Sequence, residues 1–237
     1  MGMTTVLRFT SRAARHWHAV LLRLYDSLTR SDAATAPADL IFVMAGRMER
    51  KQYGLELYRA GAAPWLALSV GRFEVNRMRG LDWEGFDDLV ALRNRTPTTA
   101  RHFFILMDSS GVRFETARLR RWSTYGEALA LRELLRRKPA RSVIVVSTDV
   151  HLRRVSVALG DVFRDAPVKF LYVAVPPHLS FPRRDEWWAR PEDRSFVVRE
   201  MLKLAGYRLI LSMGPWATRR LMRLKEADFS VRRPGVP

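Results

Sequence analysis

Short apolar runs alternate with stretches of helical periodicity from about residue 40 onward. The apolar runs cover residues 40–46, 65–71, 102–108, 142–148 and 168–175. The helical stretches cover residues 48–60, 84–93, 123–137 and 149–160. Continuous apolar strands separated by helices are typical of a parallel sheet with helices on both faces. The pattern therefore predicts an α/β domain with five buried strands, and leaves residues 109–122 as either a long loop or an extra β-hairpin.

The two ends of the chain follow different patterns. Residues 6–30 predict a helix with an apolar side and many arginines, which either lies on a membrane surface or packs on its own domain. Packing is the more common arrangement. Residues 31–39 are small and polar and predict a linker, while residues 193–228 predict helices interrupted after Gly214. The expected organisation is a helix with its linker (1–38), an α/β domain (39–212) and a C-terminal helix and tail (213–237).

The charge balance narrows the function classes. The 237 residues carry 41 Lys and Arg against 24 Asp and Glu, a formal net charge of +17. Such a balance favours nucleic acid, an anionic membrane or phosphorylated small molecules as partners, although an arginine-rich genome produces the same excess. Cysteine is absent, so disulfides and thiolate metal sites are excluded. Without a recognisable membrane span or signal peptide, we expect a cytoplasmic chain, with peripheral contact at the inner membrane as an option.

Ligands of such sheets bind beyond the carboxyl ends of the strands. Those ends are residues 45–47, 70–74 and 147–154. Gly46 and Gly71 directly follow strands, where glycine lets a ligand approach the backbone, although turn formation alone also explains either one. Neither a dinucleotide fingerprint nor a P-loop occurs. Thr124 and Glu127 have the spacing of a helix capping box, for which a structural role is sufficient.

The stretch VIVVSTDVHLRR at residues 143–154 is the most informative strand end. Thr148 or Asp149 is suited to cap the following helix, whose first turn offers free N–H groups to an anion. His151 falls in that turn, and a histidine beside cations and a helix start tends to stay neutral and able to transfer a proton. Arg153 and Arg154 follow on different sides of the helix. The alternative is an ordinary strand followed by a solvated basic helix.

Three stretches in order resemble the YdcF-like family, which includes the SanA and ElyC envelope proteins: residues 46–71, 121–135 and 143–159. The resemblance covers about residues 39–212 and implies a Rossmann-like three-layer sandwich with a mostly parallel five-stranded sheet. It also implies a polar pocket at the strand carboxyl ends. Matching positions would form that pocket: Gly46, Arg50, Gly71, Ser123, Thr124, Glu127, Thr148, His151 and Arg154. Their neighbours Arg47, Asp149 and Arg153 complete the candidate site.

The leading hypothesis is a protein of bacterial envelope or cell-wall metabolism that binds a phosphate-bearing or nucleotide-like ligand, with transferase or hydrolase chemistry as an option. His151 would transfer the proton, Arg50 and Arg154 would clamp the anion, and Glu127 would orient a hydroxyl or the histidine. The alternative is a non-catalytic module for S-adenosylmethionine or a nucleotide. A nucleic-acid binder ranks last because no recognition motif is present. The five histidines show no metal-ligand spacing, so no metal is predicted.

Overall fold

The computed structural model describes residues 12–32, 37–98, 102–117 and 123–214. Their centre is a six-stranded sheet in the order β4-β3-β2-β1-β5-β6. The strands are β1 (Leu40–Val43), β2 (Leu66–Gly71), β3 (His102–Asp108), β4 (Gly111–Ala117), β5 (Ser142–Ser147) and β6 (Lys169–Ala174). β1, β2, β5 and β6 pair in parallel, so their carboxyl ends lie along one edge. The α/β class predicted from the apolar runs is confirmed.

The prediction of five mostly parallel strands is wrong in count and partly in direction. β3 runs antiparallel to β2, and β4 runs antiparallel to β3. Residues 109–122 therefore contain the second strand of a hairpin. Only Ser109 and Ser110 join the two strands, and a loop this short permits only an antiparallel return. An apolar run shows that a strand is buried but not which way it points, so the pattern did not reveal this reversal.

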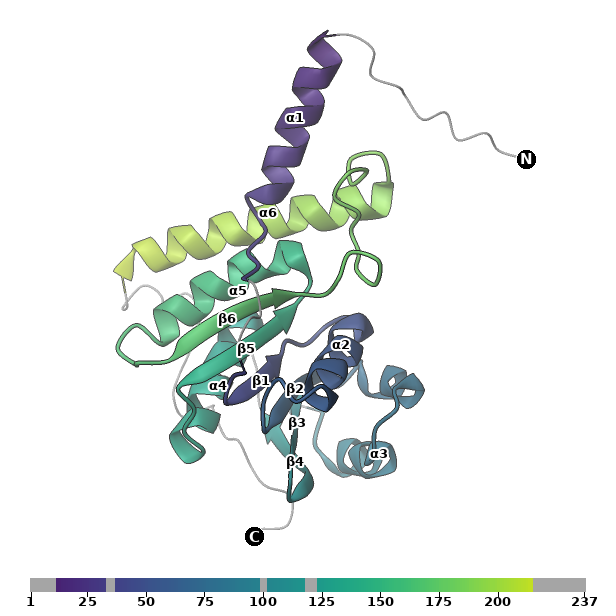
Figure 1. The fold of residues 1–237 in the computed structure, drawn as a ribbon, viewed down its shortest axis with the longest axis vertical. Coiled ribbons are helices and arrows are strands. Elements are labelled where there is room, and N and C mark those ends of the chain that lie inside the picture. Colours follow the sequence, from purple (N-terminus) through teal and green to yellow (C-terminus); the bar gives the residue numbers. More distant parts are fainter. Residues whose placement is uncertain (1–11, 33–36, 99–101, 118–122, 215–237) are drawn as a thin grey trace, which may run out of the picture.

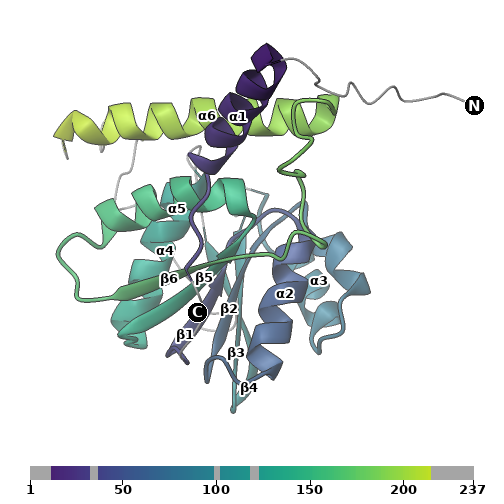
Figure 2. The same cartoon turned by 45° about the horizontal axis from the view of Figure 1, so that its top comes forward.

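Helices cover both faces of the sheet, and one face carries an additional outer helix (Figures 1 and 2). The helices are α1 (Arg12–Asp26), α2 (Met48–Arg59), the 3₁₀ helix η1 (Val75–Gly80), α3 (Phe86–Arg95), α4 (Ser123–Arg137), α5 (Asp149–Val162) and α6 (Pro191–Ser212). β1 shows why both faces need cover: Leu40 and Phe42 enter the core beneath α4 and α5, whereas Ile41 and Val43 enter the core beneath α2 and α3. α6 packs on α5 as an additional outer layer.

α1 packs through its carboxyl-terminal half and projects at its other end (Figure 1). Tyr25 and Leu28 are buried with Val150, Trp187 and residues of α6 in a small third core. Of the two arrangements considered for this helix, packing on its own domain therefore describes its carboxyl-terminal half. The opposite half stands clear of the sheet, and residues 6–11 of the predicted helix lie outside the described residues.

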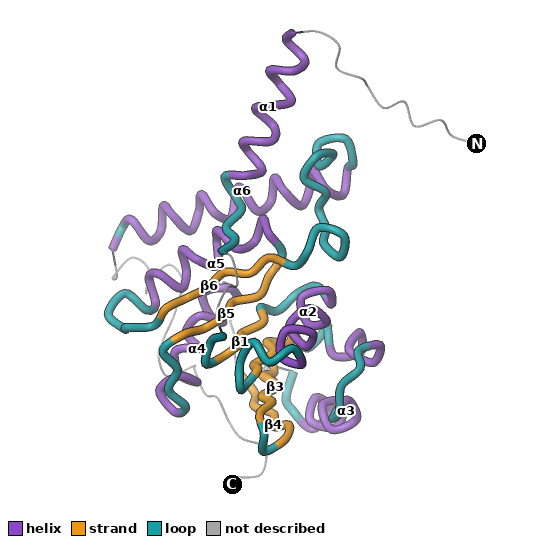
Figure 3. The backbone as a smooth tube through the Cα atoms, in the orientation of Figure 1, coloured by secondary structure: helices purple, strands orange, loops and turns teal. Residues whose placement is uncertain are grey.

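The predicted linker joins the sheet at its first residues. Asp32 accepts a hydrogen bond from the Tyr172 amide through Oδ2 at 2.9 Å, and its own amide donates to the Tyr172 carbonyl at 2.7 Å. The Arg30 guanidinium lies 4.2 Å from the centre of the Tyr172 ring. This segment therefore follows the free edge of β6, where the tube of Figure 3 passes from purple helix to teal loop. At the other end of the chain, the predicted helix beyond Gly214 lies outside the described residues.

Close packing of α2 on β1 depends on one glycine. A methyl group added at Gly54 would lie 2.3 Å from Cγ2 of Val43, whereas one added at Gly206 in α6 would meet nothing within 4 Å. We expect Gly54→Ala to lower the free energy of unfolding by about 1–3 kcal/mol, because helix and strand must separate. Gly206→Ala should instead raise it by up to about 1 kcal/mol through helix propensity. Urea unfolding at constant m-value measures both; equal effects would contradict the close contact.

Candidate functional site

The candidate site lies where the connections of the sheet diverge. β1 leads through α2 on one face to β2, whereas β5 arrives from α4 and continues into α5 on the other face. Ligands of open α/β sheets bind at such a divergence, outside the strand carboxyl ends. Arg50 of α2 spans it: Nη1 donates to the Ala45 carbonyl at 2.5 Å and Nη2 donates to Thr148 Oγ1 at 2.8 Å. Two stretches 98 positions apart thus meet through one side chain.

Arg50 is a buried cation with incomplete partners. Only 4% of the residue is exposed, and Nε has no hydrogen-bond partner. Among the described residues, no carboxylate forms an ion pair with its guanidinium within 4 Å. Burial lowers the pKa of Arg50 to about 10, while Glu127 and Glu74 oppose the shift from a greater distance. The group still carries its charge at neutral pH, so it presents a positive charge without a contacting counter-ion.

His151 stands beside this cation in the first turn of α5. Its Nδ1 lies 2.7 Å from Ser147 Oγ and its Nε2 lies 3.2 Å from Thr124 Oγ1. Arg154 also donates to Thr124 Oγ1, and Tyr207 is hydrogen-bonded to the same hydroxyl; Thr124 therefore accepts from Arg154 and can give its single proton to Nε2. That arrangement favours a neutral ring with its proton on Nδ1. Burial, reinforced by the charges of Arg154 and Arg50, holds the pKa of His151 well below its usual value.

Arg154 has partners within the protein. Its Nε donates to Glu200 Oε2 at 2.9 Å and Nη2 donates to Glu200 Oε1 at 3.2 Å, a forked pair between α5 and α6. Lys203 reaches the same carboxylate at 2.9 Å. The sequence predicted Arg154 as part of an anion clamp, but its charge is balanced here by a carboxylate. Arg154 therefore positions Thr124 and ties α6 to the site.

Two side-chain carboxylates accept hydrogen bonds from the backbone amides of the loop after β1. Glu127 accepts from the Ala45 amide at 2.8 Å, and Glu74 accepts from the Gly46 amide at 2.9 Å. Glu74 also pairs with the buried Lys51 at 2.5 Å. Burial raises the pKa of Glu127. These amides are therefore engaged, and the carboxylate of Glu127 holds a neighbouring loop instead of closing the predicted capping box.

The two predicted glycines serve this arrangement differently. Gly46 has φ +126°, a backbone conformation that residues with a side chain rarely adopt, and it turns the chain from β1 toward Arg50. At Gly71 an added methyl group would lie 2.8 Å from Glu74 Oε1. Gly71 therefore leaves room for the carboxylate that holds the Gly46 amide, so both glycines support the loop after β1.

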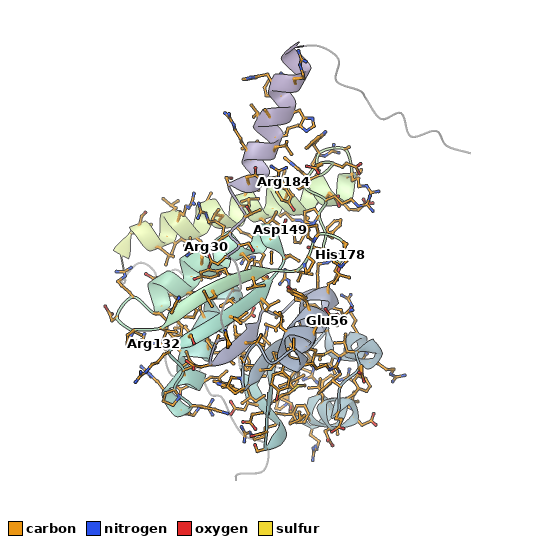
Figure 4. All side chains as sticks on the ribbon, in the orientation of Figure 1. Arg30, Glu56, Arg132, Asp149, His178 and Arg184 are labelled. Atoms are coloured by element: carbon orange, nitrogen blue, oxygen red, sulfur yellow. The ribbon has the colours of Figure 1, made fainter. Side chains whose placement is uncertain are left out.

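The remaining predicted residues lie around the site and not at its centre. Asp149 accepts from Tyr25 Oη at 2.5 Å beneath the base of α1 (Figure 4), and burial raises the pKa of Asp149. Arg47 pairs with Glu49 at the start of α2. The Arg153 amide donates to the Leu28 carbonyl. Ser123 begins α4, and its side chain is outside the described set.

Several buried polar residues were missed from sequence: Lys51, Ser69, Glu74, His102 and Glu200. His102 is the most informative, because it begins β3 opposite Gly71 and its Nδ1 has no hydrogen-bond partner. Burial lowers the pKa of His102 to about 4. An antiparallel β3 places its first residue at the edge where its neighbours end. The wrong strand direction therefore removed His102 from the predicted site.

The forked pair generates a stability prediction. Arg154→Met leaves the buried Glu200 carboxylate with only Lys203, so we expect the free energy of unfolding to fall by about 3 kcal/mol. The double variant Arg154→Met/Glu200→Met should be more stable than Arg154→Met alone, because no unpaired charge remains. Chemical denaturation of the parent protein, the two single variants Arg154→Met and Glu200→Met, and the double variant measures this double-mutant cycle. Arg164→Met, at an exposed pair with Asp161, is the control and should cost less than about 1 kcal/mol. Additive effects would contradict the pairing.

The lowered pKa of His102 predicts a pH dependence of stability. Between pH 6.5 and about 4 the unfolded chain takes up a proton that the folded protein does not bind. This residue should therefore lower the free energy of unfolding by about 2 kcal/mol between pH 7.5 and pH 5. Denaturation at both pH values should show this loss reduced in His102→Gln, while His178→Gln, at an exposed position, should follow the parent protein. The same loss in both variants would exclude His102 as its source.

No family model, curated protein or solved structure matches this chain. The resemblance to the YdcF-like family therefore stays a prediction. Any function assigned to the site depends on its own geometry and chemistry.

Proposed function

We propose that the carboxyl edge of β1 and β5, in a Rossmann-like sheet, binds the phosphate group of a small ligand. The observation that carries this proposal is the guanidinium of Arg50, which is buried, charged and without a carboxylate partner among the described residues. Leaving a charge buried without a counter-ion is costly, and a phosphate oxygen is the acceptor that guanidinium matches best. A bound anion would supply the missing negative charge and an acceptor for Nε of Arg50, at the point where the connections of the sheet diverge.

The two helix starts beside Arg50 support the same ligand. α2 and α5 begin there, and neither N-cap residue, Arg47 or Thr148, donates or accepts a side-chain capping bond. The Thr148 hydroxyl accepts from Arg50 instead. In α5 the Asp149 carboxylate already accepts a hydrogen bond from the Val150 amide at 2.7 Å. The support for a bound anion therefore comes from the positive ends of the two helix dipoles, and not from free first-turn amides. Because the amides of Ala45 and Gly46 already donate to carboxylates, the proposal assigns the phosphate to the helix starts and not to the loop after β1.

His151 gives the site a proton-transfer group. A neutral imidazole can accept a proton at Nε2 from an attacking hydroxyl or water, once that group takes the place of the Thr124 hydroxyl, and can return the proton to a leaving group. Thr124 and Ser147 fix the ring from both nitrogens, so its orientation is set before a ligand arrives. Transfer or hydrolysis of a phosphate-bearing substrate is the chemistry that this pair, a buried cation and a neutral base, supports best.

Binding of inorganic phosphate and pyrophosphate tests the proposal. We expect either anion to raise the unfolding temperature at constant ionic strength, since a ligand that binds only the folded state stabilises it. Arg50→Gln keeps a side-chain amide but removes the charge, and should weaken binding about 10- to 100-fold in calorimetry. Arg136→Gln, at an arginine whose side chain is 67% exposed, is the matched control and should bind normally.

Two outcomes would contradict phosphate recognition. Equal phosphate affinity in Arg50→Gln and the parent protein would remove Arg50 from the site. Stabilisation by S-adenosylmethionine or adenosine, with none by phosphate or pyrophosphate, would instead favour the non-catalytic module.

A further inference from the structure

Exposed apolar side chains gather on one outer layer of the protein. Among the described residues, six of the seven large hydrophobic side chains that are exposed belong to α1, to α6 or to its C-cap. They are Trp17, Leu24, Val198, Leu202, Leu209 and Met213, and the seventh is Phe73. Scattered single hydrophobic residues need no explanation, whereas a concentration on one layer marks an interaction surface.

The residues of α6 form a continuous stripe. Val198, Leu202, Ala205, Leu209 and Met213 recur at intervals of four, three, four and four positions, and all are exposed. That spacing keeps them on one side of an α-helix, along about 22 Å of its axis. The opposite side of α6 packs on α5, so the stripe faces away from the sheet (Figure 2).

Positive side chains border the stripe. Arg194 precedes it, and Arg199 and Arg208 lie on its two flanks, all of them exposed. Of the acidic residues in α6, Asp193 and Glu200 are buried, and only Glu192 in the first turn is exposed. The outer face of α6 is therefore an apolar band with cationic borders.

α1 adds a second element of the same character. Trp17 is 64% exposed and Leu24 is 42% exposed, and the exposed Arg15 and Arg23 lie on the same helix. Tyr25 at the end of α1 and Val197 and Leu204 of α6 belong to the same third core. The exposed apolar residues of both helices therefore lie on the side of the sheet that α5 and α6 cover (Figure 2).

We propose that the outer face of α6, together with the exposed residues of α1, docks on the surface of an anionic phospholipid bilayer. Apolar side chains enter the headgroup boundary while arginines contact lipid phosphates, which is how basic amphipathic helices bind bilayers. A second copy of the chain is the less suitable occupant, because two copies facing each other through α6 would bring their arginine borders together. Contact is superficial: none of the described helices is long and apolar enough to cross a bilayer.

Vesicle co-sedimentation of the full chain tests this surface. The expected result is binding to vesicles of equal parts phosphatidylglycerol and phosphatidylcholine, with much weaker binding to pure phosphatidylcholine. Leu202→Gln/Leu209→Gln should reduce the partition coefficient about tenfold or more, because two exposed leucines no longer enter the bilayer. Arg199→Gln/Arg208→Gln should reduce it about fivefold per arginine on anionic vesicles only.

Phe73→Gln is the matched control, since Phe73 is 70% exposed but lies in the turn after β2. It should bind vesicles like the parent protein. Unchanged binding of the leucine variant would overturn the proposal. So would a parent protein that sediments as a dimer in solution and becomes monomeric in the leucine variant, because the stripe would then join two copies. Phosphate affinity should be the same in all these variants, so this surface and the proposed ligand site can fail independently.

Discussion

The guanidinium of Arg50 joins the two halves of the sheet at the point where their helices separate. Its bonds to Ala45 and Thr148 connect the loop after β1 with the start of α5. The pairing of β1 with β5 sets the spacing of the two strands. Because the side chain of Arg50 is buried, its bonds replace water and hold the loop after β1 to the start of α5. His151 follows three positions after Thr148, so Arg50 supports the helix start that carries His151.

Two other buried cations near Arg50 are balanced by carboxylates. Lys51 contacts Glu74, and Arg154 contacts Glu200, each at hydrogen-bond distance. Buried ion pairs contribute little net stability, but removing one partner is strongly destabilising. Among the described residues, Arg50 therefore differs from Lys51 and Arg154 in having no contacting carboxylate, while Glu127 is a buried carboxylate that accepts from the Ala45 amide without an ion pair.

Sequence periodicity predicted the elements better than their directions. α4 begins and ends where the pattern placed it, because its apolar face and its first turn are both local signals. The direction of β3 depends on how it pairs with β2 across the sheet, which no local pattern encodes; the two-residue connection then fixes only the direction of β4. The residue types of the site were recognisable at strand ends: Thr124 contacts His151, and Arg50 contacts Thr148 at the start of the same helix. The pairing of Arg154 with Glu200 was not recognisable, because it depends on how α6 crosses α5.

Asp32, predicted as part of a linker, and Arg30, predicted as the end of the N-terminal helix, cover the outer strand of the sheet. Asp32 exchanges hydrogen bonds with the backbone of Tyr172, and Arg30 lies over its ring. An uncovered edge strand offers free N–H and C=O groups to other chains and invites aggregation. Arg30 and Asp32 thus cover the free edge of β6 at Tyr172. A shortened chain that began at residue 39 would keep all six strands but expose a template for intermolecular β-pairing.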